Sequence, residues 1–241
     1  SKKPSSASAA FFSNDWKGSG TVVLIITSRV DGLPELSVDF AACEAVICAD
    51  GGLQVAEQLG MPQGKPVYLI GDYDSGTPPT AAERAAAEDL VLLPSVKDMT
   101  DSEAAIDYAV AHGFSRIRVL GGLGGRLDHT MGNLGLLAKY AGDPRVEELW
   151  FEDGQNRVFL KTPGTFRVPA AGPENRFSYF GLIADGGAVR GLTITGAKYP
   201  LEDHTLTPDT TLGVSNEVAA GSPFAEVTHT EGLLLVILSK D

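Results

Sequence analysis

The feature that most constrains the fold is a regular alternation of short apolar runs with helical segments between residues 21 and 151. The apolar runs are rich in β-branched residues and most of them end at glycine, proline or aspartate, which is typical of buried strands. Strands that alternate with helices form a parallel sheet with helices on both faces. The strands are predicted at residues 21–27, 45–49, 66–70, 90–93, 116–120 and 146–151.

The pattern changes after about residue 155, where no helical period remains. Short β-type runs follow one another, separated by glycine, proline, asparagine and aspartate, which predicts a sandwich. These runs cover residues 157–160, 165–168, 177–183, 188–194, 211–214, 225–230 and 233–238. The sequence thus predicts an N-terminal, mostly parallel α/β (Rossmann-like) domain at residues 20–157 and a C-terminal β-sandwich at residues 158–241. Residues 1–19 are predicted to be a disordered leader.

Charge and composition exclude several classes of function. The formal net charge of −12 disfavours binding to nucleic acid, which requires a basic surface. No apolar run approaches the roughly 20 residues of a membrane helix, and the N-terminal residues lack the apolar core of a signal peptide. Cys43 and Cys48 are too few for a disulfide scaffold and have no zinc-site spacing. We therefore expect a cytoplasmic protein that binds neither nucleic acid nor membranes.

Aspartates follow the predicted strands at the points where the chain leaves the sheet. Asp72 and Asp74 come directly after residues 66–70, and Gly71 allows a tight turn there. Alternate residues of an extended chain point the same way, so both carboxylates can face one cation. Magnesium prefers oxygen ligands of this kind, with phosphate as the other partner. Three further aspartates lie just after a strand or at the start of the following helix, namely Asp50, Asp101 and Asp128.

A single aspartate in such a position is ordinarily a turn or helix cap. The carboxyl ends of parallel strands, however, meet at one edge of the sheet, where ligands bind. The five aspartates are all expected at that edge, and Lys97 and Arg126 lie among them. This combination favours a metal and phosphate site over a set of unrelated caps.

A glycine-rich stretch at residues 121–125 separates a predicted strand from a predicted helix, as a phosphate-binding loop does. It is not the dinucleotide fingerprint, because Leu127 stands where the third glycine is required. It is not a P-loop either, since the chain's Gly-Lys pair, Gly64-Lys65, is followed by proline. Two interpretations stay open: a backbone that approaches a phosphate, with Arg126 as a bidentate donor, or a tight strand-to-helix turn.

Six short motifs occur in the order seen in one enzyme family. They are Asp50-Gly51-Gly52, Gly71-Asp72-Tyr73-Asp74-Ser75, Lys97-Asp98-x-Thr100-Asp101-x-Glu103, Gly124-Gly125-Arg126-Leu127-Asp128-His129 with Asn133 beyond, Gly196-Ala197-Lys198-Tyr199-Pro200-Leu201 and Gly213-Val214-Ser215-Asn216-Glu217. Together they resemble the thiamine pyrophosphokinase (thiamin diphosphokinase) family, in its bacterial form. The resemblance extends from Thr21 to the C-terminus.

The resemblance implies an enzyme that transfers the terminal pyrophosphate of ATP to the hydroxyethyl oxygen of thiamine, releases AMP and needs Mg²⁺. It also implies an α/β nucleotide domain, a β-sandwich, and a homodimer with the active site at the subunit interface. Two alternatives remain open on the sequence alone. One is a thiamine or nucleotide sensor without turnover, and the other is a metal-dependent phosphohydrolase that releases orthophosphate.

The resemblance also assigns roles to individual residues. The catalytic group is Asp72, Asp74, Asp101 and Arg126, of which the three aspartates hold magnesium. The ATP-binding group is Asp50, Gly51, Lys97, Thr100, Asp128 and Asn133. Ser215 and Asn216 contact thiamine. Family members often carry an aromatic residue just after the Ser-Asn-Glu triplet, whereas this chain has Val218 and Ala219, and its nearest aromatic residue is Phe224.

Overall fold

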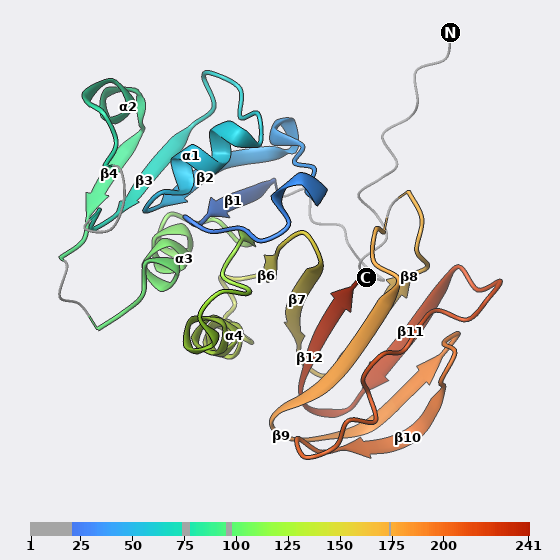
Figure 1. Cartoon of the computed structure of the whole chain (residues 1–241). Coiled ribbons are helices and arrows are strands. Elements are labelled where there is room, and N and C mark those ends of the chain that lie inside the picture. Colours follow the sequence, from blue (N-terminus) through green and yellow to red (C-terminus); the bar gives the residue numbers. More distant parts are fainter. Residues whose placement is uncertain (1–20, 74–77, 95–97, 174) are drawn as a thin grey trace, which may run out of the picture. The chain divides into compact units, whose positions relative to one another are not determined.

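The computed structural model describes residues 21–73, 78–94, 98–173 and 175–241. The described chain forms two compact units, and the boundary between them falls after Arg157. Figure 1 labels the elements of both units, which are described separately below. None of the helices within these residues has the length and apolar character needed to cross a membrane.

The N-terminal unit contains a parallel sheet in the order β4-β3-β2-β1-β5-β6. Its strands are β1 (Val22–Ile26), β2 (Cys43–Ala49), β3 (Val67–Gly71), β4 (Asp89–Leu92), β5 (Arg116–Leu120) and β6 (Glu148–Glu152). The central strand β1 is fully buried from Leu24 to Ile26. Burial on both faces explains its continuous run of β-branched and leucine side chains.

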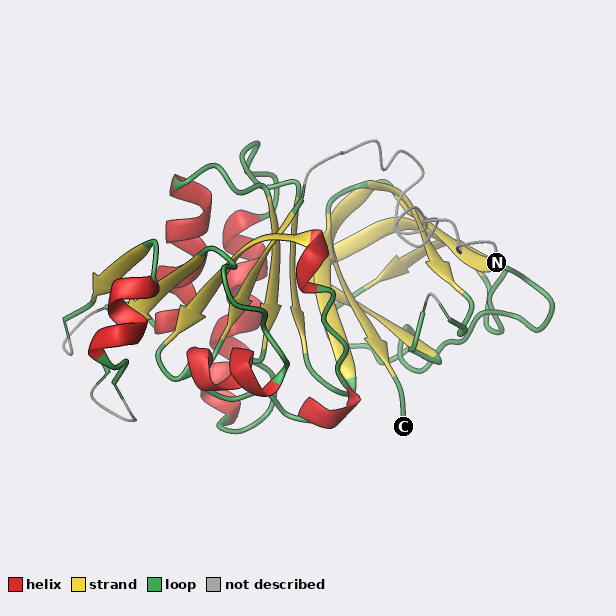
Figure 2. Ribbon diagram, turned by 90° about the horizontal axis from the view of Figure 1, so that it is seen from above, coloured by secondary structure: helices red, strands yellow, loops and turns green. Residues whose placement is uncertain are grey.

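Helices cover both faces of this sheet, as Figure 2 shows. The α-helices are α1 (Gly52–Gln58), α2 (Ala81–Ala86), α3 (Asp101–Ala111) and α4 (Leu127–Tyr140), and the short 3₁₀ helices are η1 (Leu33–Glu35) and η2 (Phe40–Ala42). Thr80 begins α2 with a capping box, in which its side chain and that of Glu83 bond to each other's backbone N–H. The predicted alternation of parallel strands with helices is confirmed.

The C-terminal unit consists of antiparallel strands. They are β7 (Asn156–Lys161), which begins at the boundary between the units, β8 (Gly164–Pro169), β9 (Tyr179–Thr195), β10 (Leu201–Leu206), β11 (Phe224–His229) and β12 (Glu231–Ser239). The long strand β9 pairs with β12 along its first half and with β10 and β11 further on. Phe180, Leu182, Leu192, Val227 and Val236 are among the residues of its buried core. The predicted change from strands alternating with helices to strands without helices is therefore confirmed for the described residues of this unit.

Three details of the predicted C-terminal strands are wrong. The runs at residues 177–183 and 188–194 belong to one strand, β9, which continues through Gly186 with φ at 67°. Residues 211–214 form a turn instead of a strand, closed by the hydrogen bond from the backbone N–H of Val214 to the carbonyl oxygen of Thr211 at 3.1 Å. Strand β10 was missed because its sequence, Leu-Glu-Asp-His-Thr-Leu, has four polar residues in succession and therefore shows no apolar run.

Candidate active site

Two aspartates stand directly after neighbouring parallel strands. Asp50 follows β2 and Asp72 follows β3. The backbone N–H of Asp50 donates to the carbonyl oxygen of Ile70 at 2.8 Å, so the two strand ends are joined where the aspartates leave the sheet. Gly71 fits between them because it lacks a side chain: a Cβ there would lie 2.6 Å from Oδ1 of Asp50. The structure thus brings Asp50 and Asp72 to the same edge of the sheet.

Tyr73 lies between this edge and a third aspartate. Its backbone is in the left-handed region, with φ at 52°, and its hydroxyl is buried. Burial raises the pKa of the Tyr73 phenol to about 12, and the nearby carboxylates of Asp50 and Asp101 act in the same direction. Asp101 is the first residue of α3, and the Oγ1 of its N-cap residue, Thr100, accepts a hydrogen bond from the backbone N–H of Glu103 at 3.2 Å. Asp50 and Asp101, which come from different elements, therefore lie near one phenol.

The donor chemistry of this edge suits a hard cation. Within the residues that the structure describes, no three histidine, cysteine, aspartate or glutamate side chains are grouped closely enough to hold a metal ion by themselves. Magnesium commonly takes only one or two carboxylates and completes its shell with phosphate oxygens and water. Asp50, Asp72 and Asp101 supply ligands of that type, while Asp74 and Lys97 lie outside the described residues.

The glycines after Asp50 allow α1 to begin very close to β1. A Cβ on Gly52 would lie 2.0 Å from the carbonyl oxygen of Ile26, and one on Gly51 would lie 3.3 Å from the Cβ of Ser28. Asp50 itself has φ at 51°, which turns the chain sharply out of β2. The tight turn and the close approach of α1 to β1 therefore explain why glycine stands at positions 51 and 52. A contact between Gly51 and ATP stays a prediction.

The glycine-rich loop between β5 and α4 packs against the segment that follows β1. Gly121, Gly122, Gly124 and Gly125 all have positive φ, between 67° and 93°. A Cβ on Gly121 would lie 2.1 Å from Oγ1 of Thr27, and one on Gly124 would lie 2.1 Å from Oδ2 of Asp31. Strands β1 and β5 are neighbours at the point where the strand order reverses. In open parallel sheets, ligands bind in the crevice at this point.

Two side chains of helix α4 donate hydrogen bonds to backbone carbonyl groups of the glycine-rich loop. Asn133 is buried, with 5% of its surface exposed, and its Nδ2 donates to the carbonyl oxygen of Gly122 at 2.8 Å. The hydroxyl of Thr130 donates to the carbonyl oxygen of Gly124 at 3.1 Å. The structure therefore gives Asn133 a supporting contact with the loop, and its predicted contact with ATP remains untested.

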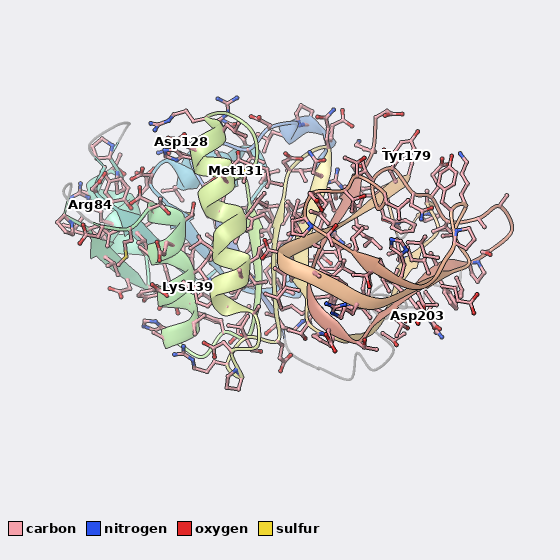
Figure 3. All side chains as sticks on the ribbon, turned by 90° about the horizontal axis from the view of Figure 1, so that it is seen from below. Arg84, Asp128, Met131, Lys139, Tyr179 and Asp203 are labelled. Atoms are coloured by element: carbon pink, nitrogen blue, oxygen red, sulfur yellow. The ribbon has the colours of Figure 1, made fainter. Side chains whose placement is uncertain are left out.

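Arg126 carries an exposed charge at the end of the same loop. Its guanidinium donates to both carboxylate oxygens of Asp128, from Nε to Oδ1 at 3.1 Å and from Nη2 to Oδ2 at 2.5 Å. Asp128 stands at the start of α4 (Figure 3), and this ion pair lowers the pKa of its carboxyl. The two side chains are 73% and 63% exposed. An exposed pair of this kind contributes little to stability, so Arg126 can exchange its partner for a phosphate at small cost.

Arg29 repeats this arrangement on the facing segment and was missed by the sequence analysis. Its Nε lies 2.8 Å from Oδ1 of Asp31, two residues further on, as Asp128 is two residues after Arg126. Its guanidinium lies over the loop, because a Cβ on Gly125 would be 3.3 Å from Nη1 of Arg29. The available signal was an Arg-x-Asp pattern directly after the first strand.

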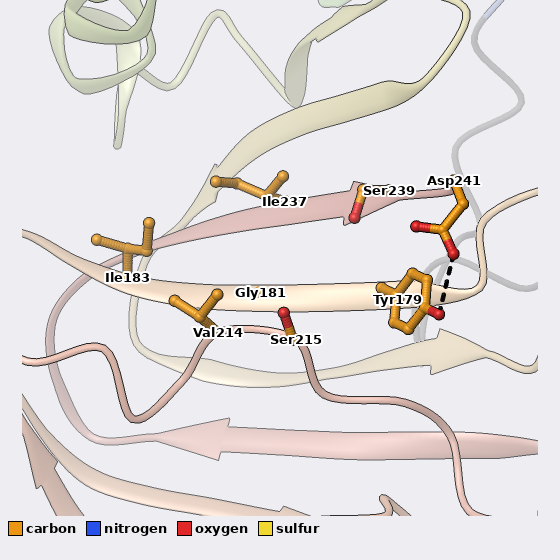
Figure 4. A pocket seen from close by; sticks show the side chains of 8 residues that line it. All are labelled: Tyr179, Gly181, Ile183, Val214, Ser215, Ile237, Ser239 and Asp241. Carbon is orange, nitrogen blue, oxygen red and sulfur yellow. Dashed lines mark hydrogen bonds between the residues drawn. The ribbon is translucent and has the colours of Figure 1, made fainter.

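In the C-terminal unit, the two predicted thiamine contacts have different surroundings. Ser215 is exposed and has φ at 59°. Asn216 is buried, and its Nδ2 donates to the carbonyl oxygen of Tyr199 at 2.8 Å. Its Oδ1 accepts from the backbone N–H groups of Tyr199 and Glu217 at 3.1 and 2.9 Å. Asn216 thus fixes the turn from which Ser215 projects, and Ser215 lines an open cavity of about 420 Å³ (Figure 4).

Comparison with known proteins separates the chain into two recognised parts. The family model described as the catalytic domain of thiamin pyrophosphokinase matches residues 39–147, and the model of its vitamin B1 binding domain matches residues 171–234. The thiamine pyrophosphokinase of Bacillus subtilis is 33% identical over 177 residues, which are 73% of this chain and 79% of that protein. The chain belongs to the thiamine pyrophosphokinase family. The resemblance inferred from the six motifs is confirmed.

Solved structures of thiamine pyrophosphokinases share the fold. The crystal structure of the Bacillus subtilis protein has a TM-score of 0.74 at 26% identity, and the match covers 92% of this chain and 99% of that one. The protein from Geobacillus thermodenitrificans has a TM-score of 0.71 at 33% identity, with coverage of 92% and 98%. The aspartates at the strand ends and the glycine-rich loop lie within the residues matched by the catalytic-domain model. Ser215 lies within those matched by the vitamin B1 binding-domain model.

Proposed function

We propose that this chain transfers the terminal pyrophosphate of ATP to the hydroxyethyl oxygen of thiamine, in a magnesium-dependent reaction that releases AMP. The observation that carries the proposal is the match to a catalytic domain followed by a vitamin B1 binding domain in one chain. The carboxylates at the strand ends of the first part and the cavity at Ser215 in the second part support it.

The proposed roles at the acidic edge follow from charge. Asp72, Asp74 and Asp101 would hold magnesium, which when bound would draw negative charge from the phosphate oxygens. Asp72 or Asp101 would also orient the thiamine hydroxyl or accept its proton. Such general-base help contributes about 10²–10⁴-fold, so charge neutralisation and positioning are expected to dominate the rate.

The proposed phosphate contacts come from the two segments that follow β1 and β5 and lie against each other. Arg126 would release Asp128 and bind the phosphate chain, and Arg29 would do so from the opposite side. Because glycine has no side chain, the backbone of the loop would be accessible to phosphate oxygens once Arg126 and Arg29 turn toward them. Asp50, Gly51, Lys97, Thr100, Asp128 and Asn133 are the other residues proposed to line or support the ATP site.

Several finer features are also proposals. The N-terminal unit would bind ATP as a Rossmann-like domain, and the C-terminal unit would be the family's β-sandwich, with Ser215 and Asn216 serving the thiamine site. The working form would be a cytoplasmic homodimer with its active site at the subunit interface. Cross-linking or sedimentation of the purified chain, compared with activity at the same concentrations, tests the dimer.

The proposed reaction is tested by incubating the purified chain with thiamine, ATP and Mg²⁺ and measuring AMP and thiamine diphosphate together. Equal amounts of the two products are expected. Release of orthophosphate without thiamine diphosphate would instead identify a phosphohydrolase. Thiamine binding without AMP formation would identify a sensor.

The metal assignment is tested by Asp72→Asn and Asp101→Asn, which preserve the size of the side chain but remove its charge. Each is expected to depress turnover strongly without loss of the folded state. Glu57→Gln makes the same change of charge at an exposed position in the last turn of α1, at the opposite end of that helix from Asp50, and serves as the control. Near-normal turnover of either aspartate variant would remove that residue from the metal site.

A further inference from the structure

The ion pair between Arg29 and Asp31 lies on the glycine-rich loop. Oδ2 of Asp31 is 2.1 Å from the point where a Cβ on Gly124 would be, and its Cγ is 3.1 Å from that point. The carboxylate therefore occupies the space that glycine, having no side chain, leaves open at position 124. An anionic group of the chain is thus placed against a loop that joins a strand to a helix, as phosphate-binding loops do.

The guanidinium of Arg29 lies flat over the next residue of the loop. Its Nη1, Cζ and Nε atoms are 3.3, 3.4 and 3.4 Å from the Cβ position of Gly125. These nearly equal distances mean that the plane of the group faces the loop. Nε donates to Oδ1 of Asp31 at 2.8 Å, and Nη2 donates to Oδ2 at 3.5 Å. The carboxylate is therefore bound by the edge of the guanidinium, which is also how arginine binds a phosphate.

The backbone of this segment is held from two sides. The hydroxyl of Thr27 donates to the carbonyl oxygen of Arg29 at 2.9 Å and lies 3.2 Å from that of Leu120, the last residue of β5. The N–H of Gly154 donates to the carbonyl oxygen of Asp31 at 2.8 Å. The fold of the N-terminal unit therefore fixes the point on the loop from which both side chains project.

The two side chains, in contrast, can change partners. The Arg29 side chain is 68% exposed and the Asp31 side chain is 41% exposed. An exposed ion pair contributes little to stability, so another anion can replace the carboxylate on the guanidinium at small cost. A phosphate offers oxygens to the same edge of the guanidinium. The displaced carboxylate would then stand beside the phosphate, and the two like charges would repel each other.

We propose that the Asp31 carboxylate is a stand-in for a phosphate group on the glycine-rich loop, and that a phosphate of the bound nucleotide displaces it from Arg29. Asp31 thereby lowers the affinity for the phosphate chain, and it rebinds Arg29 when the product leaves. That the phosphate belongs to ATP rests on the proposed function, whereas the competition between the two anions rests on the contacts of Arg29 and Asp31.

The test is calorimetric titration of the full chain with α,β-methylene ATP, which cannot be cleaved to AMP, in the presence of Mg²⁺ and at low salt to limit screening. Asp31→Asn keeps the size of the side chain but removes its charge. It is expected to tighten binding by roughly three- to ten-fold, the effect of removing one exposed charge close to an anion. Asp31→Ser removes the same charge with a smaller side chain and should also bind more tightly. Damage to the loop would weaken binding, so it cannot produce this gain.

Two further variants show whether Asp31 competes for Arg29. Arg29→Ala is expected to weaken binding of the analogue by roughly ten-fold, because bonds to a charged group are lost. Asp31→Asn should give a smaller gain when it is combined with Arg29→Ala than when it is made alone. Asp143→Asn is the matched control, because Asp143 also pairs with an arginine two residues away, Arg145, at 2.7 Å, and lies beyond the C-terminal end of α4. It should bind the analogue as the parent does.

Thermal melting shows which variants are folded, and AMP formation with thiamine is measured separately. Unchanged or weaker binding of the analogue by the folded Asp31 variants would overturn the proposal, even if the parent makes thiamine diphosphate. An equal gain with and without Arg29 would overturn it too, since the carboxylate would then repel the phosphates without competing for the guanidinium. If the gain depends on Arg29 but the parent forms no AMP, the proposed reaction fails and the competition stands.

Discussion

Replacing Asn133 with alanine separates support of the glycine-rich loop from direct contact with ATP. The variant loses the 2.8 Å hydrogen bond from Nδ2 to the carbonyl oxygen of Gly122, at a side chain that is 5% exposed. A partly buried carbonyl oxygen that loses its donor costs about 1–3 kcal/mol. Alanine's better helix propensity returns up to about 0.7 kcal/mol in α4. The expected net loss of unfolding free energy is therefore about 0.3–2.3 kcal/mol.

The assay for Asn133→Ala combines urea unfolding with steady-state kinetics. We expect a lower midpoint with an unchanged m-value. Because the loosened loop lies at the proposed phosphate site, the KM for ATP should rise several-fold while the KM for thiamine stays constant. Met131→Ala, at a 60% exposed position on the same helix, is the control and should change stability by less than about 0.5 kcal/mol.

One combination of results would refute this reasoning. If Asn133→Ala unfolds at the same urea concentration as the parent but its KM for ATP rises by about 10²-fold or more, Asn133 contacts the nucleotide itself. The supporting contact inferred from the structure would then not be its main role.

Arg126→Ala should leave the melting temperature unchanged, because its ion pair is exposed, but should lower kcat/KM by about 10²–10³-fold through loss of charge stabilisation; an equally active variant would contradict the phosphate role. Gly135→Ala should raise the unfolding free energy by about 0.5–1 kcal/mol in a urea titration, because Gly135 lies in the middle of α4 and a Cβ there meets no atom within 4 Å. Destabilisation would show that another part of the protein packs on this surface of the helix. Cys48 should resist iodoacetamide at pH 8 in the folded chain and react only in denaturant. Burial raises the pKa of its thiol to about 12, so that only about 10⁻⁴ of it is thiolate at this pH. Labelling of the native protein at the rate of a free cysteine would contradict its placement in β2.

The order of elements in the N-terminal unit could be predicted because buried parallel strands leave a strong trace in sequence. Strand β1 is a continuous apolar run because it is covered on both faces, and glycine, proline or aspartate follows each of the other parallel strands within two residues. The C-terminal unit was harder to predict. Its long strand β9 passes through Gly186 without stopping, and its edge strand β10 is polar, so neither composition nor period marks their limits.

The sequence predicts which site residues lie at one edge of the sheet, but it does not predict which way their side chains point. Asp50 and Asp72 reach one edge because parallel strands deliver their ends there. Asn133 and Asn216 belong to two of the six family motifs and were predicted to contact the substrates. In the structure, both side-chain amides are buried and bind backbone groups. A motif shows which residues gather, but only packing shows which side of a loop a side chain occupies. Arg29 was missed for a related reason, because its position over Gly125 depends on a contact between segments far apart in the sequence.

The central claim is that the carboxylates gathered at the acidic edge of the N-terminal unit share one cation with the phosphates of ATP. The most direct measurement is anomalous diffraction from crystals grown with Mn²⁺ in place of Mg²⁺ and a non-hydrolysable ATP analogue. We predict a manganese peak that at least two of Asp72, Asp74 and Asp101 reach, directly or through one water. A peak held by the phosphates alone, with all three carboxylates turned away, would contradict the account.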